Sequence, residues 1–319
     1  MDTLVLTRAD VARHLEALSL MEQLRDDLRD RAARKAAGGQ HALAPLPEGS
    51  AVVDFPGASP GLPAYTVKVD ARFPAQEPDT RSVLQLHDLH SGALLAVMDS
   101  DHLTRLRAGL VGAIAADALA VPGATHVAVL GATPFSRVQI KSLRLVRSLQ
   151  HLRVYDPDPA RAHVFAHELW TALSLPVRVE DTVEAAIADA HIVVSTLAGP
   201  EPLLFPGMLA PGTHVTALGM DEADLPGLAA NLIRQTRLFC DDRERTLASD
   251  LLERAHLDGS VIAAELGEVL LGAAPGRTSP SEVTLFSGVG LPSQDLAAAW
   301  QVYEGARYDE GVQRVDFGA

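Results

Sequence analysis

The stretch of sequence that decides the fold runs from His126 to Ser136 and reads HVAVLGATPFS. Its first five residues form a short apolar run typical of a buried β-strand, and Gly131 follows this run directly. Beyond it, apolar residues recur at helical spacing from Gln139 to Leu149. A strand, a glycine turn and a helix in this order predict the first unit of a parallel sheet of the kind that binds dinucleotides.

The alternation of strands and helices continues toward the C-terminus. Strands that recur between helical segments predict a parallel sheet covered by helices on both faces. The predicted strands span residues 152–156, 176–179, 192–196 and 214–219, and a predicted helix spans residues 160–173. We therefore expect an α/β fold in which residues 121–290 form a Rossmann-like, doubly wound domain.

The N-terminal part has a different pattern. Thr7 and Asp10 have the spacing of a helix cap, and apolar residues follow at helical spacing from Val11 to Leu20. Residues 38–63 are rich in glycine and proline, which favours turns and strands. Further strands are predicted at 65–69, 82–86 and 93–98, and helices at 103–120 and from residue 292 onward. These segments predict an α+β domain made of residues 1–120 and 291–319.

The composition limits the partners of the protein. Twenty-seven basic and 41 acidic residues among 319 leave a formal net charge of −14, which argues against a nucleic acid or an anionic membrane as a partner. Cys240 is the only cysteine, so no intramolecular disulfide and no cysteine-rich zinc site can form, and we expect no metal. No apolar stretch approaches the roughly 18 residues that span a bilayer, and the first residues lack a signal-peptide pattern. We therefore expect a cytoplasmic protein.

Lysine is rare in this chain. Only three of the 27 basic residues are lysines: Lys35, Lys68 and Lys141. Each is a candidate for a role that arginine cannot fill. Lys68 lies on a predicted strand between two valines, where two interpretations stay open. It is either a partly desolvated ammonium that serves a substrate or a solvated lysine on a strand.

The turn after the first strand of the predicted parallel sheet is the candidate phosphate loop. It consists of Gly131, Ala132, Thr133, Pro134, Phe135 and Ser136. The backbone N–H groups of such a turn bind pyrophosphate at the start of a helix. Thr133 can offer a hydroxyl to a phosphate, but its Cβ blocks the closest backbone approach, and Pro134 removes one N–H donor. This loop alone is a weak motif.

Asp156 provides the second part of a dinucleotide site. It ends the second predicted strand, in the position from which a carboxylate accepts hydrogen bonds from both ribose hydroxyls. A carboxylate there repels a 2′-phosphate, so the expected cofactor is NAD rather than NADP. The alternative is that Asp156 makes a turn with residues 157–159 and caps the next helix. Both interpretations are kept at this point.

Seven separated segments of the chain match one known pattern in order and spacing. They are 67–69, 103–107, 129–132, 153–162, 211–221, 241–243 and 284–297. Together they cover nearly the whole chain and resemble the ornithine cyclodeaminase/mu-crystallin family. The resemblance implies a nicotinamide-binding doubly wound domain and a second domain that binds substrate and pairs two subunits into a homodimer. It also implies hydride exchange at the α-carbon of an amino acid or its imine.

The resemblance also implies roles for particular residues. Lys68 and Arg107 would hold the substrate carboxylate and its surroundings, and Asp221 would be the acid/base group near the substrate nitrogen. The alternatives are a surface helix cation for Arg107 and an ordinary loop carboxylate for Asp221. The cofactor candidates outside the phosphate loop are Arg107, Asp156, Thr196, Leu218, Gly219, Met220, Asp221 and Gly288.

The chain departs from the family pattern at several of these positions. Family enzymes usually carry a second glycine where Thr133 stands, a glutamine at Phe135 and a threonine at Ala108. A lysine of the family is replaced by Leu225, and a serine by Gly288. These departures weaken the predicted cofactor site.

The expected substrate site lacks a positively charged residue that members of the family tend to carry. Family members tend to carry an arginine upstream of the lysine, but no arginine or lysine lies between Lys35 and Lys68. His41 is the nearest polar residue that can stand in for it. A substrate carboxylate would therefore lose a bidentate partner.

Three functions remain open from the sequence. The first is an NAD(H)-dependent oxidoreductase that reduces an imine or oxidises the matching amine, with a substrate that need not be a standard α-amino acid. The second is a cyclodeaminase-like lyase that releases ammonia. The third is a non-catalytic or repurposed relative with a degraded cofactor site.

Two charged clusters are interpreted without a catalytic role. His87, Asp88 and His90 are expected to form a hydrated turn between strands rather than a metal site. Residues 241–245, of sequence DDRER, are expected to form a capped and solvated helix start.

Overall fold

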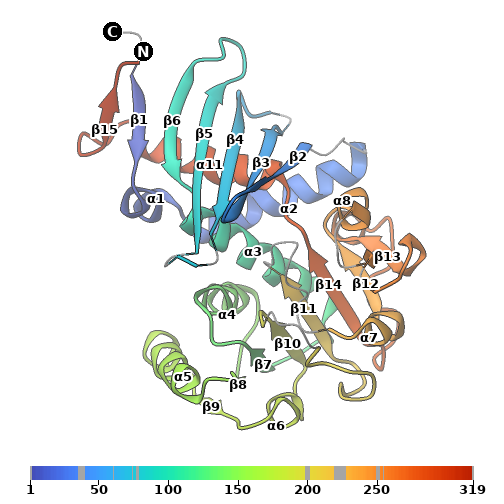
Figure 1. Cartoon of the computed structure of the whole chain (residues 1–319). Helices are drawn as coiled ribbons and strands as arrows, with labels where there is room; N and C mark the ends of the chain where they lie inside the picture. Colours follow the sequence, from blue (N-terminus) through green and yellow to red (C-terminus); the bar gives the residue numbers. More distant parts are fainter. Residues whose placement is uncertain are drawn as a thin grey trace. The chain divides into compact units, whose positions relative to one another are not determined.

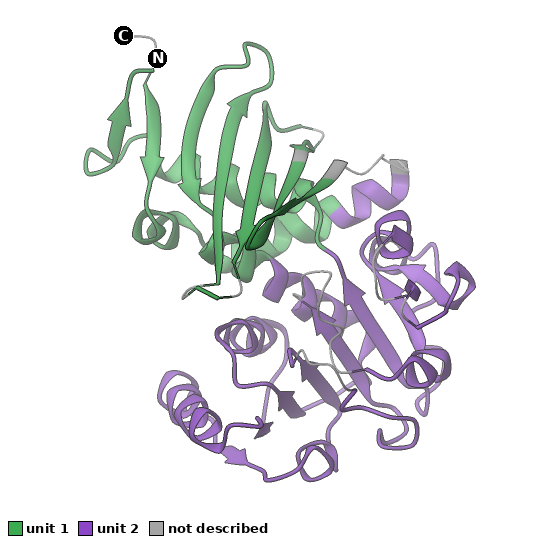
Figure 2. Ribbon diagram, in the orientation of Figure 1, with its two compact units in different colours: residues 1–27, 36–107, 290–319 green, residues 28–35, 108–289 purple. Residues whose placement is uncertain are grey.

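A computed structural model describes residues 2–34, 40–59, 61–73, 75–76, 79–197, 202–218, 228–248, 252–253 and 255–317. The chain divides into two compact units, shown in Figure 2. Unit 1 comprises residues 1–27, 36–107 and 290–319, and unit 2 comprises residues 28–35 and 108–289. The helix α3 (Asp101–Leu119) passes from unit 1 into unit 2 at residue 108. The assignment of separate substrate-binding and cofactor-binding roles to residues 1–120 plus 291–319 and to 121–290 remains a prediction.

Unit 2 contains an eight-stranded sheet in the order β13-β12-β14-β11-β10-β7-β8-β9, labelled in Figure 1. Its strands are β7 (His126–Leu130), β8 (His151–Tyr155), β9 (Val177–Val179), β10 (Ile192–Ser195), β11 (His214–Leu218), β12 (Arg237–Cys240), β13 (Ile262–Glu265) and β14 (Thr284–Gly288). All neighbouring strands are parallel. The helices of unit 2 are α4 (Pro134–Val146), α5 (Pro159–Leu173), α6 (Val183–Ile187), α7 (Ala230–Gln235), α8 (Arg243–Ala248), the 3-10 helix η1 (Gly259–Val261) and α10 (Leu266–Leu271).

The central strands of this sheet are buried on both faces. All residues of β10 and β11 are buried, as are the last four of β7. Such strands are apolar along their whole length because helices cover both faces of a parallel sheet. From β7 the order runs outward to β8 and β9 on one side and to β10 and β11 on the other, so a topological switch point lies between β7 and β10. The predicted doubly wound α/β fold is confirmed.

The helix after the first strand of unit 2 begins earlier than the periodicity predicted. It starts at Pro134 rather than at Gln139, because the Thr133 side chain accepts a hydrogen bond from the Ser136 N–H and caps the helix. Pro134 occupies the first turn, where its missing N–H has no partner to lose. The predicted phosphate loop therefore includes the first turn of α4.

Unit 1 contains a seven-stranded sheet in the order β15-β1-β6-β5-β4-β3-β2. Strands β1 and β6 are parallel and all other neighbours are antiparallel. The strands are β1 (Thr3–Leu6), β2 (Gln40–Leu46), β3 (Gly49–Gly57), β4 (Ala64–Arg72), β5 (Thr80–Asp88), β6 (Leu94–Asp99) and β15 (Gln313–Val315). The further helices are α1 (Arg8–His14), α2 (Ala17–Arg34), which enters unit 2 at residue 28, and α11 (Pro292–Ala306).

The N-terminal helical pattern is split between two helices. The predicted cap at Thr7 is confirmed, with the reciprocal Asp10 contact of a capping box. However, α1 ends at His14, and α2 begins at Ala17. The Glu16 carboxylate accepts hydrogen bonds from the backbone N–H groups of Leu18 and Ser19, so Glu16 caps a new helix where the sequence suggested a continuous one.

Helix α11 covers one face of the sheet of unit 1, where it contacts β3, β4 and β5 (Figure 1). Leu84 and Leu86 of β5 are fully buried on the covered face. Successive side chains of a strand point to opposite faces of the sheet. The residues next to those on the covered face therefore lie on the face that α11 does not cover. The register places Val53, Val67, Val69, Val83 and Val97 on that opposite face. We call these five residues the valine face.

Candidate functional site

Lys68 lies on the covered face of β4 and is buried, with 4% of its surface exposed. Its Nζ is 3.0 Å from Asp70 Oδ2 and 3.6 Å from Asp295 Oδ2. Asp70 lies two residues along the same strand, which puts it on the same face as Lys68. Asp295 comes from the first turns of α11. The interpretation of Lys68 as a solvated strand lysine is therefore wrong.

Arg107 also lies in the interior of unit 1. Its Nε donates a hydrogen bond of 2.8 Å to Asp295 Oδ1, and its Nη1 lies 3.4 Å from Gln294 Oε1. Gly290, with a φ of +80°, lies so close to the guanidinium that a Cβ at this position would collide with it. Arg107 is 9% exposed, so it is not a surface helix cation. Asp295 thus joins Lys68 and Arg107, the two residues expected at the substrate.

Asp70, Gln294 and Asp295 were missed as site residues. Asp295 and Gln294 are 2% and 0% exposed, and both belong to the C-terminal segment that carried the resemblance. A signal for Asp70 was present as well, because a lysine and an aspartate two residues apart on a strand must share a face. The pairing with α11 had no local signal.

The structure does not fully describe four predicted site residues, which are Gly219, Met220, Asp221 and His41. Gly219, Met220 and Asp221, together with the neighbouring Leu225, lie outside the described residues. The side chain of His41 also lies outside them, although its backbone pairs with Asp54 in β3. Asp54 in turn is the register partner of Lys68. The backbone of His41 therefore lies in the same cross-strand row as Lys68.

The phosphate loop begins with a glycine that the fold requires. Gly131 follows β7 with a φ of +106°, a backbone conformation that favours glycine. A Cβ at Gly131 would lie 2.6 Å from Thr196 Oγ1. The Thr196 N–H donates to the carbonyl of Leu130 at 2.9 Å, which holds the ends of β7 and β10 together. The structure thus brings Gly131 and Thr196 together at the switch point.

Three N–H groups of the loop are hydrogen-bonded to side chains. The Ala132 N–H donates to Asp156 Oδ2 at 2.8 Å, and the Thr133 N–H donates to Ser136 Oγ at 3.0 Å. The Ser136 N–H donates to Thr133 Oγ1 at 3.1 Å. The Thr133 hydroxyl lies 3.2 Å from that of Thr196. A threonine in place of the family's second glycine therefore builds a capping box at the start of α4.

Asp156 is buried and strongly hydrogen-bonded. Besides the Ala132 N–H, it accepts hydrogen bonds from the Asp158 N–H at 2.9 Å and from Arg161 Nη2 at 2.6 Å. Burial raises the pKa of this carboxyl, but the Arg161 guanidinium and the two N–H groups outweigh burial and lower the pKa overall. Asp156 is therefore an anion that links the end of β8 to the phosphate loop.

The alternative interpretation of Asp156 is partly right. Asp156 does form the turn before α5, but Asp158 caps that helix by accepting from the N–H groups of Ala160 and Arg161. A hollow of about 100 Å³ adjoins the turn. Its lining consists of Tyr155, Asp156, Pro157, Pro159, Val179, Glu180 and Asp181. The hollow therefore lies beside an ionised carboxylate.

Leu218 lies beside the glycine at position 288. The two residues are register partners on β11 and β14. A Cβ on Gly288 would lie 2.8 Å from Leu218 Cδ2 and 3.2 Å from Phe286 Cε1. A serine at position 288 would therefore require the Leu218 side chain to shift.

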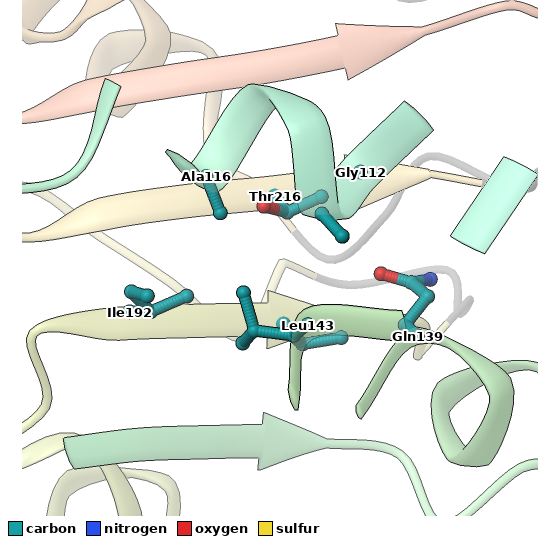
Figure 3. A pocket seen from close by; sticks show the side chains of 8 residues that line it. Gly112, Ala116, Gln139, Leu143, Ile192 and Thr216 are labelled. Atoms are coloured by element: carbon teal, nitrogen blue, oxygen red, sulfur yellow. The ribbon is translucent and has the colours of Figure 1, made fainter. Parts of the chain in front are cut away.

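Unit 2 also holds a small, partly open pocket with a cavity volume of about 10 Å³, shown in Figure 3. It is lined by Gly112, Ala113 and Ala116 of α3, Gln139 and Leu143 of α4, Ile192 and Val194 of β10, and Thr216 of β11. Both amide atoms of Gln139 are buried without a hydrogen-bond partner among the described residues. The lining carries no charged side chain, so we assign it no part in the chemistry.

The acidic residues before α8 are not solvated. Asp241 and Asp242 are 4% and 7% exposed, and Asp242 Oδ2 lies 2.6 Å from Arg31 Nη2. Asp242 does accept a hydrogen bond from the Arg245 N–H, so the helix start is capped as predicted. The solvated part of that prediction is wrong because Arg31 of α2 pairs with Asp242 within unit 2.

The histidine-containing turn has its predicted form. The Asp88 carboxylate accepts hydrogen bonds from the N–H groups of His90 and Ser91 between β5 and β6. Across the described ranges, no group of three or more His, Cys, Asp or Glu side chains could hold a metal ion. Within the same ranges, no helix is both long and apolar enough to cross a membrane.

Comparison with known proteins decides the family. The model of the ornithine cyclodeaminase/mu-crystallin family matches residues 1–310. The chain belongs to this family. The ketimine reductase mu-crystallin of Mus musculus is 33% identical to it over 231 residues, which cover 71% of this chain and 70% of that protein. The resemblance predicted from the sequence is confirmed.

Two solved structures have the same fold. The Δ1-pyrroline-2-carboxylate reductase of Thermococcus litoralis, in complex with NADH and L-proline, has a TM-score of 0.91 and 25% identity, covering 98% of this chain and 100% of that one. An archaeal alanine dehydrogenase dimer with bound NAD also has a TM-score of 0.91 and 25% identity, with coverages of 99% and 100%. Both neighbours therefore carry a nicotinamide cofactor.

Proposed function

We propose that the protein is an NAD(H)-dependent oxidoreductase that reduces an imine or oxidises the matching amine. The observation that carries this proposal is Asp156. Its buried, ionised carboxylate ends β8 beside the Gly131 turn, and a carboxylate in this position accepts the ribose hydroxyls of NAD in doubly wound folds. The named relatives include a ketimine reductase and a reductase that holds NADH, which supports the same reaction class.

The residues of unit 2 fit a nicotinamide cofactor. Asp156 and its adjoining hollow suit the adenosine ribose, and the switch point lies at Gly131 and Thr196. The N–H groups of Ala132 and Thr133 are bonded to side chains rather than to backbone carbonyls, so side-chain rotation can free them for a pyrophosphate. Leu218, Gly219, Met220 and Gly288 are proposed to line the nicotinamide. The cofactor, when bound, supplies or accepts the hydride.

The substrate is proposed to meet three residues of this chain. Lys68 and Arg107 are proposed to lie beside it and to set the charge of the site, and Asp295 keeps both cations in place. Asp221 holds a proton for the substrate nitrogen during reduction and takes one from the ammonium group during oxidation. His41 is proposed as a further polar contact of the substrate.

The reaction class can be tested by following NADH oxidation at 340 nm with a panel of cyclic and linear imines. We expect turnover with at least one imine. Lack of stabilisation by NAD, NADH, NADP and NADPH in a thermal-shift assay would contradict the proposal and favour a non-catalytic relative. Release of ammonia from ornithine or lysine without a lasting change in NADH would select a cyclodeaminase instead.

Cofactor choice is expected to depend on Asp156. The variant Asp156→Asn should weaken NADH binding roughly tenfold, because a ribose loses a charged acceptor. It should also strengthen NADPH binding, since the Arg161 guanidinium then no longer faces a carboxylate and can meet a 2′-phosphate. Fluorescence titration with NADH and NADPH measures both effects.

Asp158→Asn is a matched control for this variant. It removes the same charge from the same turn, and asparagine also caps helices well. We expect it to keep the NADH affinity of the unmodified protein. Equal affinities of Asp156→Asn and Asp158→Asn for NADH would refute the role of Asp156.

We also propose that the protein is a cytoplasmic homodimer that pairs through the valine face. Helix α11 covers only the opposite face of these strands, and Val83 is 45% exposed. The valines form an apolar patch beside Gln85 and Asp99 on this face, and a second copy would stabilise such a patch. The alanine dehydrogenase neighbour is a dimer, which supports the proposal.

The variant Val83→Glu should convert the dimer into a monomer, because it places a charge in the proposed interface. Sedimentation velocity at micromolar concentration measures the change. Val164→Glu, at a 60% exposed position of α5, is the control and should remain dimeric. A monomeric unmodified protein, or a dimeric Val83→Glu variant, would contradict the proposal.

A further inference from the structure

The side chains of Lys68, Arg107, Asp70 and Asp295 form a set of linked ion pairs, which we call the charge cluster. Asp295 lies between the two cations, at 3.6 Å from Lys68 Nζ and 2.8 Å from Arg107 Nε. Asp70 contacts only Lys68 in this set, at 3.0 Å. Two positive and two negative charges therefore sum to zero.

Charged neighbours on the same sheet face do not supply a surplus of positive charge. Asp54 is the register partner of Lys68 and adds one negative charge. Arg72 lies two residues beyond Asp70 on β4 and adds one positive charge. Asp88, the register partner of Ala64, adds a further negative charge at the end of the same face, so these neighbours add no net positive charge to the charge cluster.

Burial makes this neutrality important. The side chains of Lys68, Arg107 and Asp295 are 4%, 10% and 3% exposed, so water screens their charges poorly. A ligand carboxylate that binds Lys68 must displace Asp70 or add a further negative charge beside two existing carboxylates. The first event leaves the Asp70 carboxylate without its cation, and the second brings three carboxylates together in a poorly screened site, so both are costly. A ligand without a carboxylate avoids this cost.

Asp70 is the residue that cancels the positive charge. Without it, Lys68, Arg107 and Asp295 would carry a net charge of +1 and could attract an anion. With it, they carry none. Its side chain is also the most exposed of the charge cluster, at 24%, so it is the carboxylate that an incoming ligand can reach.

We propose that the substrate is an imine that lacks a carboxylate beside its C=N carbon, and that Asp70 determines this specificity. This inference rests on the proposed function, because it assigns a substrate class to the same reaction. The product is then a simple cyclic or aliphatic amine. Asp70 pairs with the ammonium group of Lys68, which would otherwise bind the carboxylate of a substrate. In this way Asp70 excludes carboxylated analogues.

The test compares 1-pyrroline with 1-pyrroline-2-carboxylate as substrates of NADH oxidation. We expect the unmodified protein to favour 1-pyrroline in kcat/KM by roughly tenfold or more. The variants Asp70→Asn and Asp70→Val should shift this ratio toward the carboxylate by roughly tenfold. Glu22→Gln, which removes one charge from an exposed position of α2, should leave the ratio unchanged. A higher kcat/KM for the carboxylate in the unmodified protein, or an unchanged ratio in both Asp70 variants, would overturn the inference.

A binding measurement separates this inference from the proposed function. If neither imine supports NADH oxidation, the proposed function fails, but L-proline and pyrrolidine can still be compared by calorimetric titration in the presence of NAD. We expect the unmodified protein to bind pyrrolidine more tightly than L-proline, and Asp70→Asn to gain L-proline binding. An identical preference in the two proteins, or no binding of either amine, would overturn the inference.

Discussion

Replacement of Asp295 by alanine is expected to lower the free energy of unfolding by about 3–5 kcal/mol. The carboxylate is 3% exposed and is shared by Lys68 and Arg107, so its loss removes one anion from two buried cations at once. Imine reduction should be lost as well, because the two proposed substrate contacts are no longer held in place. Urea unfolding at pH 7.5 measures the first effect, and NADH oxidation measures the second.

Glu304→Ala provides the control within the same helix. Glu304 forms an exposed pair with Arg307 at 3.7 Å, and such pairs contribute at most about 1 kcal/mol. Asp295→Glu keeps the charge and should retain more stability than the alanine variant. If Asp295→Ala unfolded at the same urea concentration as Glu304→Ala, the charge cluster would not be a stabilising element of unit 1.

Acid is expected to destabilise unit 2 through His214. This side chain is fully buried between Thr284 and Thr216, with ring nitrogens 2.9 and 3.1 Å from their hydroxyls. Burial, with a further contribution from the charges of Arg277 and Arg147, lowers the pKa of His214 to about 3. The unfolded chain binds a proton near pH 6.5. The unfolded state therefore holds more protons between these two pH values.

The sign of this effect follows from the lowered pKa. The stability that neutral His214 provides is complete above pH 6.5 and is lost as the pH falls toward 3, by up to about 1.4 kcal/mol per pH unit. The variant His214→Gln should show a flatter dependence of unfolding free energy on pH between 7.5 and 5. Urea unfolding at four pH values measures the slope.

His90→Gln is the matched control, because His90 is exposed in the turn after β5. It removes the same kind of group and should leave the slope unchanged. Parallel pH curves for His214→Gln and the unmodified protein would show that the buried ring does not account for acid sensitivity.

The cofactor side of the site was largely predictable from sequence. A strand, a glycine with positive φ and a capped helix are consecutive, so local turn chemistry determines their arrangement. Asp156 could be found because the residue at the end of the second strand of such a sheet lies beside the first turn. The capping box of Thr133 and Ser136 was not predicted, although its spacing is visible in the sequence.

The substrate side was predictable only in part. Lys68 and Arg107 were named through the family resemblance, but their partners were not. Asp295 reaches them from the last long helix of the chain, and no periodic pattern relates α11 to β4. The exposed roles considered for Arg107 and for Asp242 failed for the same reason. From the sequence alone, a charged side chain near a turn is expected to be exposed to solvent. Only the fold shows whether a distant cation or carboxylate pairs with it.

The sequence by itself determined the doubly wound sheet, the turn at Gly131 and the acidic residue at its side. These features depend on apolar periodicity and on turn chemistry between neighbours in the chain. Only the tertiary structure decided the net charge around Lys68, which α11 and the register of β4 bring to zero. Coulomb energies depend on distances in space and on burial, and neither is encoded in the spacing of residues along a sequence.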